Sequence, residues 1–103
     1  MDRQHVISYS DALDALVALS PLLQGSCFRI TLRGGADTWD LDLLGYASPA
    51  MNRLLKRLGA THRPDEGYQA THGRHETYRA VLDRVPILVT VATQTITRVS
   101  GRV

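Results

Sequence analysis

Two runs of alternating apolar and polar residues flank Gly34 and Gly35, and this pattern constrains the fold more than any other feature of the chain. Successive side chains of a strand point to opposite faces, so each run predicts a strand with one buried and one solvated face. Glycine supplies the positive φ angles of tight turns, so the pair predicts an antiparallel hairpin. The alternating apolar residues are Phe28, Ile30, Leu32, Trp39, Leu41 and Leu43.

The register of this hairpin follows if Arg33 lies opposite Thr38. The buried face then pairs Leu32 with Trp39, Ile30 with Leu41 and Phe28 with Leu43. The solvated face pairs Thr31 with Asp40 and Arg29 with Asp42. A slip of one residue would place the apolar set in water.

A helix is expected on each side of this hairpin. Ser8 and Asp11 form a capping-box pattern before an apolar stripe of helical spacing. Gly25 is expected to end the helical segment. Because proline disrupts a helix interior, the first helix should end near Leu19 or restart at Ser20 and Pro21. The second helix should be capped by Ser48 and should end at Gly59.

The second half of the chain predicts a further hairpin after an irregular loop. Residues 60–75 are polar and rich in Gly, Pro and His, and within them 68–72 has the pattern of a short strand. Residues 77–82 and 87–93 alternate, with Leu82 expected opposite Ile87, Ala80 opposite Val89 and Tyr78 opposite Val91. Residues 94–103 either extend the last strand or fray.

The element order is helix, hairpin, helix, hairpin over a single domain spanning residues 1–103. This αββαββ order predicts an α+β fold in which two helices cover one face of a four-stranded antiparallel or mixed sheet. The expected layout is a permuted ferredoxin-like sandwich with its second and fourth strands central. The alternative is a simple meander with less regularly packed helices.

Composition bears on the cellular compartment and the source of the protein. The single cysteine, Cys27, excludes an intramolecular disulfide, and no apolar run has the length of a signal peptide or membrane span, so a cytoplasmic protein is expected. Of the 12 Lys and Arg residues only Lys56 is a lysine, a bias typical of a GC-rich genome such as that of an actinobacterium or its phage. A net charge of +2 does not by itself indicate nucleic-acid binding.

Asp40 and Asp42 stand one residue apart on a predicted strand, where both carboxylates share a face. Such a pair resembles the acidic strand of the nucleotidyltransferase superfamily, which implies a metal-dependent enzyme as one alternative function. That superfamily also places a Gly-containing turn and a helix before the strand. Here Gly34 and Gly35 precede the strand with no room for a helix, so the solvated face of a hairpin is the favoured interpretation.

Histidines and the cysteine supply no convincing reactive site. His62, His72 and His75 lie in or near the irregular loop, with Glu76 beside the last of them, but the order is not that of a zinc protease. No base is predicted beside Cys27, so it is interpreted as a structural thiol. No catalytic residue, metal site or cofactor is therefore predicted.

A basic stretch offers a nucleic-acid-binding alternative. The residues are Arg53, Lys56, Arg57 and Arg63, with His62 beside them and Arg98 and Arg102 in the tail. They would contact phosphates without reading sequence, although a solvated helix face is the plainer interpretation. Sheets that bind single-stranded RNA use aromatic residues on their open face, whereas Phe28, Trp39 and Tyr78 are all predicted to point into the core.

The predicted open face of the sheet gives the best functional signal. Val81, Leu88, Thr90 and Ala92 form a weakly apolar centre, surrounded by Arg29, Arg33, Arg79, Asp40 and Asp42. An apolar patch with a charged rim is typical of a protein interface, unless the tail or residues 60–75 cover it. We therefore expect a small non-enzymatic regulatory or inhibitory protein. Its open face would bind a protein partner or a second copy in a homodimer.

Overall fold

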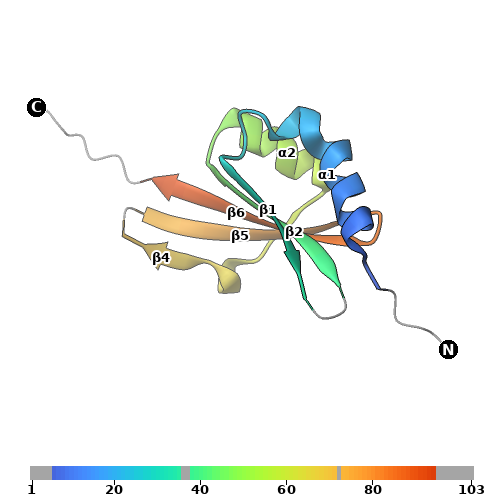
Figure 1. Ribbon diagram of the computed structural model, residues 1–103. Helices are drawn as coiled ribbons and strands as arrows, with labels where there is room; N and C mark the ends of the chain where they lie inside the picture. Colours follow the sequence, from blue (N-terminus) through green and yellow to red (C-terminus); the bar gives the residue numbers. More distant parts are fainter. Residues whose placement is uncertain (1–5, 36–37, 72, 95–103) are drawn as a thin grey trace, which may run out of the picture.

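The computed structural model describes residues 6–35, 38–71 and 73–94, which form two helices on one side of a six-stranded mixed sheet (Figure 1). The α+β class is as predicted. In chain order the elements are α1 (Tyr9–Leu23), β1 (Arg29–Gly34), β2 (Trp39–Tyr46), α2 (Pro49–Leu58), β3 (Thr61–His62), the 3₁₀ turn η1 (Pro64–Glu66), β4 (Tyr68–Ala70), β5 (Gly73–Leu82) and β6 (Val85–Gln94).

The strand order is β1-β2-β6-β5-β3, with β4 also paired to β5. β2 and β6 are parallel neighbours, and the other pairs are antiparallel. The predicted four-stranded layout is therefore not fully matched, because residues 60–75 are not an irregular loop. They contain β3, η1, β4 and the start of β5, which extend the sheet beyond β5.

Helix α1 begins with the predicted capping box: the Asp11 amide donates to Ser8 Oγ at 3.0 Å, and the Ser8 amide donates to Asp11 Oδ2 at 2.9 Å. The helix then continues through Pro21 to Leu23, so the predicted break at Leu19 or Ser20 is wrong. Pro21 lies in the last turn and removes only one amide donor. Leu22 and Leu23 both pack against the core, and this tertiary packing maintains the final turn.

Helix α2 has the predicted ends. The Met51 amide donates to Ser48 Oγ at 3.0 Å, and Gly59 closes the helix with a positive φ of 60°. The first turn lies close to β2. A side chain at Gly45 would collide with the Ser26 carbonyl and with Met51, so glycine permits the contact between layers.

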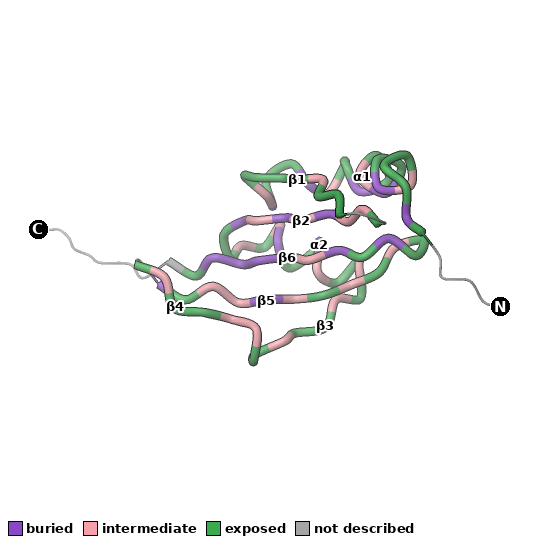
Figure 2. Tube along the Cα trace, turned by 60° about the horizontal axis from the view of Figure 1, so that its bottom comes forward, coloured by how far each residue is buried: buried purple, intermediate pink, exposed green. Residues whose placement is uncertain are grey.

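The core lies between the helices and one face of the sheet. Its fully buried large side chains are Leu41, Leu43, Val85, Ile87 and Val89 from the sheet and Leu19, Met51 and Leu54 from the helices. Figure 2 shows that buried positions concentrate along β2 and β6, the two central strands. Burial of this apolar surface is the main favourable contribution to folding.

The turn of the first hairpin is centred one residue later in the chain than predicted. Arg33 lies opposite Asp40 rather than Thr38, and Leu32 lies opposite Leu41 rather than Trp39. The turn closes where the Gly35 amide donates to the Thr38 carbonyl at 2.8 Å. This change moves every pair by two residues. A shift of two preserves the faces, so Leu41 and Leu43 are buried as predicted.

The second hairpin has a shorter turn than predicted. Leu82 lies opposite Val85, which moves Ala80 opposite Ile87 and Tyr78 opposite Val89. Asp83 and Arg84 form the two-residue connection with φ angles of 49° and 71°. Positive φ at both positions is the requirement of a type I′ turn, whose twist matches that of the strands.

Candidate binding surface on the open face of the sheet

The face of the sheet opposite the helices, here called the open face, carries all six residues predicted to form the protein interface. Alternation along the strands places them there, because each pairs with another open-face residue. Arg29 lies opposite Leu44, Arg79 lies opposite Leu88, and Thr90 lies between Leu44 and Thr77. The six residues are Arg29, Arg33, Arg79, Val81, Leu88 and Thr90.

Part of this face is covered by η1. Thr77 Oγ1 donates to the Glu66 carbonyl at 2.9 Å, and Arg79 Nε donates to Glu66 Oε1 at 2.7 Å. Thr90 is only 9% exposed, whereas Val81 is 66% exposed. Thr90 is therefore buried at the base of the predicted interface. Arg79 is held by its hydrogen bond to Glu66 of η1.

Phe28 lies on the open face, so its predicted burial in the core is wrong. It is 56% exposed, and its ring lies 4.7 Å from that of Tyr46. The Phe28 amide donates to the Leu44 carbonyl, although Arg29 is the residue opposite Leu44. Two residues thus face one, as in a β-bulge, and a bulge redirects a side chain.

The other two aromatic residues predicted in the core are half-buried and pack against it. The Trp39 ring contacts the Tyr9 ring edge-on at 4.9 Å, and Tyr78 stacks on His62 at 4.8 Å. A new aromatic pair appears instead on the open face, where Tyr68 stacks on His75 at 4.9 Å.

A cleft of about 270 Å³ lies on the open face between the two aromatic pairs. Ala92 and His75 contribute to its lining, and the buried His75 Nδ1 has no hydrogen-bond partner among the described residues. Concave apolar sites with a few polar atoms are typical binding sites. The cleft is lined by Phe28, Tyr46, Ala70, Thr71, His75, Ala92 and Thr93.

The charged rim of the open face is largely neutralised. Arg33 contacts Asp40 at 3.0 Å and Asp42 at 3.5 Å, and the hydrogen bond with Asp40 raises the pKa of Arg33. The predicted pair of Arg29 with Asp42 is therefore replaced by Arg33. Arg29 makes no ion pair with any residue in the described ranges.

The same contacts bear on the metal alternative. A guanidinium between Asp40 and Asp42 opposes binding of a cation at that position. Among the residues that the structure describes, no three His, Cys, Asp or Glu side chains gather as a metal site would require.

The histidines do not converge. His62 lies on the helix side of the sheet edge, opposite Tyr78, whereas His75 lies on the open face, and His72 falls outside the described residues. His62 Nε2 lies 2.8 Å from Glu76 Oε1, and Arg74 Nε donates to Glu76 Oε2 at 2.7 Å. The hydrogen bond with His62, followed by that with Arg74, lowers the pKa of Glu76.

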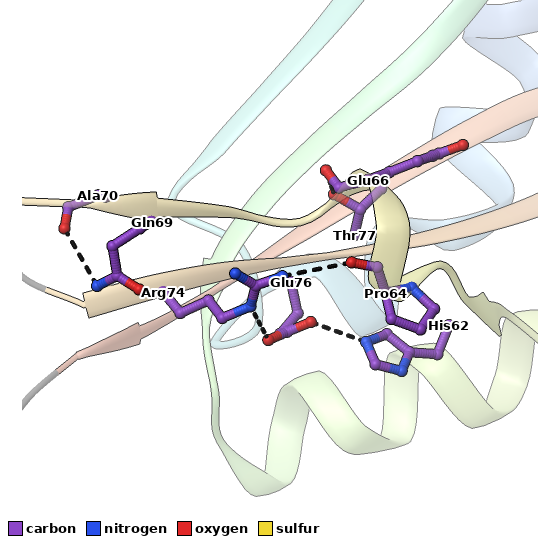
Figure 3. Close-up of polar contacts among 8 residues, drawn as sticks. All are labelled: His62, Pro64, Glu66, Gln69, Ala70, Arg74, Glu76 and Thr77. Atoms are coloured by element: carbon purple, nitrogen blue, oxygen red, sulfur yellow. Dashed lines mark hydrogen bonds and ion pairs between the residues drawn. The ribbon is translucent and has the colours of Figure 1, made fainter.

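Figure 3 shows this cluster, in which Arg74 also donates to the Pro64 carbonyl at 3.3 Å. The contacts join β5 to β3 and η1. These contacts hold neighbouring segments of the chain together and do not form a set of ligands that point into a cavity.

Cys27 is half-buried, and Ser26 Oγ lies 3.5 Å from its sulfur. Burial raises the pKa of the Cys27 thiol, against a smaller opposite effect of the Ser26 hydrogen bond. A raised pKa reduces the thiolate fraction at neutral pH, which makes Cys27 a poor nucleophile.

The predicted basic residues divide into two groups. Arg53, Lys56 and Arg57 are exposed on α2 and make no ion pair with a described residue. Arg63 instead contacts Glu66 at 3.3 Å. A hollow of about 470 Å³ beside the end of α2 includes Arg63 and Arg79, both already paired to Glu66. Arg98 and Arg102 lie outside the described residues.

Tyr46, Tyr68 and His75 are open-face aromatic residues that were not predicted from the sequence. The position of Tyr46 could have been predicted, because it continues the alternation of Asp40, Asp42 and Leu44 on the solvated face of the strand. The positions of Tyr68 and His75 could not, since their stacking depends on the pairing of β4 with β5.

A scan against protein-family models found no match, and searches of curated proteins and solved structures found no significant one. Within the described ranges, neither helix has the length and apolar character needed to cross a membrane.

Proposed function

We propose that this chain is a small non-enzymatic binding protein that regulates or inhibits a protein partner through its open face. The cleft between the Phe28–Tyr46 and Tyr68–His75 pairs carries the proposal. Large exposed aromatic side chains around a concave site are typical of the centre of a protein interface. An apolar or aromatic side chain of the partner would fill the cleft, and Arg29 and the Arg33–Asp40 pair would contact the partner farther along the open face.

The fold supports this function as a scaffold. Within the six-stranded sheet, the order β1-β2-β6-β5 and the parallel central pair support a permuted ferredoxin-like sandwich, to which β3 and β4 are additions. In such a sandwich the helices occupy one face, and the other face is available for binding.

The arrangement of charge favours a protein over a single nucleic-acid strand. Binding of single strands combines stacked aromatic residues with cations that contact phosphates. Here Phe28, Tyr46 and Tyr68 are exposed on the open face, whereas the cations that make no ion pair with a described residue lie on α2 in the helix layer. One strand would not use both sets at once.

The test is a comparison of variants in the capture and affinity of a partner from the source cells. Leu88→Arg and Tyr46→Asp should each weaken binding at least tenfold, about 1.4 kcal/mol, without changing the circular dichroism spectrum. Arg79→Glu should also weaken it, because the change disturbs both the rim and η1. Arg53→Glu on α2 is the control and should bind as wild type does. Unchanged affinity in both Leu88→Arg and Tyr46→Asp would reject the open face as the site.

Nucleic-acid binding through α2 is the second candidate, supported by three exposed cations that make no ion pair with any residue the structure describes. Contacts with phosphates release counterions, so affinity for an oligonucleotide should fall steeply with salt. The variant with both Arg53→Ala and Arg57→Ala should flatten that slope by about 2. A salt-independent affinity, or none, would remove this candidate.

A further inference from the structure

We propose that the chain forms a symmetric dimer by antiparallel pairing of β1 with β1 of a second copy. This inference concerns the free edge of the sheet and the side of α1 above it. It is independent of the open face, so the homodimer expected from the sequence is assigned here to a different surface.

The two edges of the sheet are treated differently by the fold. At the β5 edge, the short strands β3 and β4 pair with β5 and lie along its outer side (Figure 2). Short, covered edges resist pairing with other chains. The opposite edge is β1, six residues long, and no described strand pairs with its outer side.

The hydrogen-bond pattern identifies the free backbone groups of β1. The Gly35 amide bonds to the Thr38 carbonyl, which marks these two residues as a hydrogen-bonded pair. Bonded and non-bonded pairs alternate along an antiparallel ladder, so Arg33 and Thr31 also bond to β2. The amides and carbonyls of Ile30, Leu32 and Gly34 therefore point outward from the sheet.

An apolar stripe on α1 lies beside this edge. Tyr9, Leu13 and Val17 are spaced four residues apart and are 51%, 37% and 63% exposed. The Tyr9 ring contacts Trp39, whose ring occupies the space that a side chain on Gly34 would fill. This stripe thus lies on the side of α1 that faces β1, and in a dimer it would pack across the two-fold axis.

Charge selects the register of the pair. An axis at Thr31 would place Arg29 opposite Arg33 of the second copy, and like charges directly opposite are destabilising. An axis at Leu32 places Leu32 opposite Leu32 and Ile30 opposite Gly34, where the Trp39 ring covers the glycine. Arg33 then faces Thr31 of the second copy, next to its Asp42. The second register joins apolar to apolar and separates the arginines, so the edge is complementary to itself.

Two valines of nearly equal exposure provide a matched test. Val17 on α1 is 63% exposed and Val81 on the open face is 66% exposed, so either change to Glu should leave the fold intact. Sedimentation equilibrium should show a wild-type dimer, a rise of at least about tenfold in its Kd for Val17→Glu, and less than about twofold for Val81→Glu. A wild-type monomer at every concentration would overturn the proposal, and so would a dimer that Val81→Glu disrupts and Val17→Glu does not.

Hydrogen exchange of the wild-type protein tests the strand pairing without any substitution. On dimerisation, the outward amides of Ile30, Leu32 and Gly34 should slow by about a hundredfold, and dilution should reverse this slowing. The amides of Thr31 and Arg33, already bonded to β2, serve as the internal reference. A dimer in which the outward amides exchange as fast as in the monomer would also overturn the proposal.

Discussion

Arg33 balances the charge on the open face, because one guanidinium contacts both Asp40 and Asp42. Its side chain is 49% exposed, so water screens the attraction. Arg33→Gln should lower the free energy of unfolding by about 0.5–1 kcal/mol, since two neighbouring carboxylates lose their shared counter-charge. Urea denaturation measures this change. Arg29→Gln, in the same strand but without an ion pair to a described residue, should change stability by less than half as much; equal losses would show that the contacts with Asp40 and Asp42 contribute nothing specific.

Glu76 gives the protein a defined dependence on acid. Its pKa is lower in the folded chain because His62 and Arg74 hydrogen-bond to the carboxylate. A lowered pKa contributes stability above the unfolded value, and this contribution is lost as the pH falls through the folded value. Stability should therefore decline below about pH 4.3, and Glu76→Gln should make that decline shallower.

Thermal melts of wild type and Glu76→Gln at a series of pH values measure this effect. Asp65→Asn is the control, because the Asp65 carboxylate makes no ion pair with a described residue and lies on the adjacent η1. The Asp65→Asn variant should show the same decline of melting temperature with falling pH as wild type. If Glu76→Gln also reproduces it, the contacts with His62 and Arg74 do not stabilise the folded chain.

Among the elements, the two-residue turn between β5 and β6 determines how these strands pair. The alternation of side chains alone is compatible with more than one register. Asp83 and Arg84 both have positive φ, a conformation that glycine adopts more readily than arginine. Replacing them with Asn and Gly should raise the free energy of unfolding by about 0.5–1 kcal/mol. Chemical denaturation measures this gain in stability.

Gly59→Ala should have the opposite effect. A side chain would be strained at a φ of 60° with no contact to offset the strain, so the free energy of unfolding should fall by about 1 kcal/mol.

Between Thr61 and Ala70, the short strand predicted within 68–72 is present as β4, whereas β3 and η1 were not predicted. β3 has two residues, too few for a periodicity to appear, and it exists because β5 offers a partner. Phe28 is a single residue whose position local sequence pattern also failed to predict. Its place in the alternation predicted burial, but the bulge at Leu44 turned it to the open face.

At the scale of the whole molecule, only one side of the sheet is a sealed core. Leu41 and Leu88 are leucines on neighbouring strands that point to opposite faces, and Leu41 is 0% exposed. Leu41→Ala should cost about 2–5 kcal/mol, whereas Leu88→Ala should cost about 1 kcal/mol. Denaturation in guanidinium measures both. Equal costs would mean that the open face is packed as tightly as the core, and the proposed binding surface would then be rejected.

The sequence by itself determined the start of each helix, the end of α2, the two hairpins and the face of each central strand. These depend on local chemistry: the Ser8–Asp11 box, the Ser48 cap and the alternation of Leu41 and Leu43. Only the tertiary structure decided the parallel pairing of β2 with β6, the two-residue shifts in register, the cover that η1 provides and the aromatic cleft. Those features join residues distant in the chain, and their energies depend on which strand lies alongside, a property that no local pattern encodes.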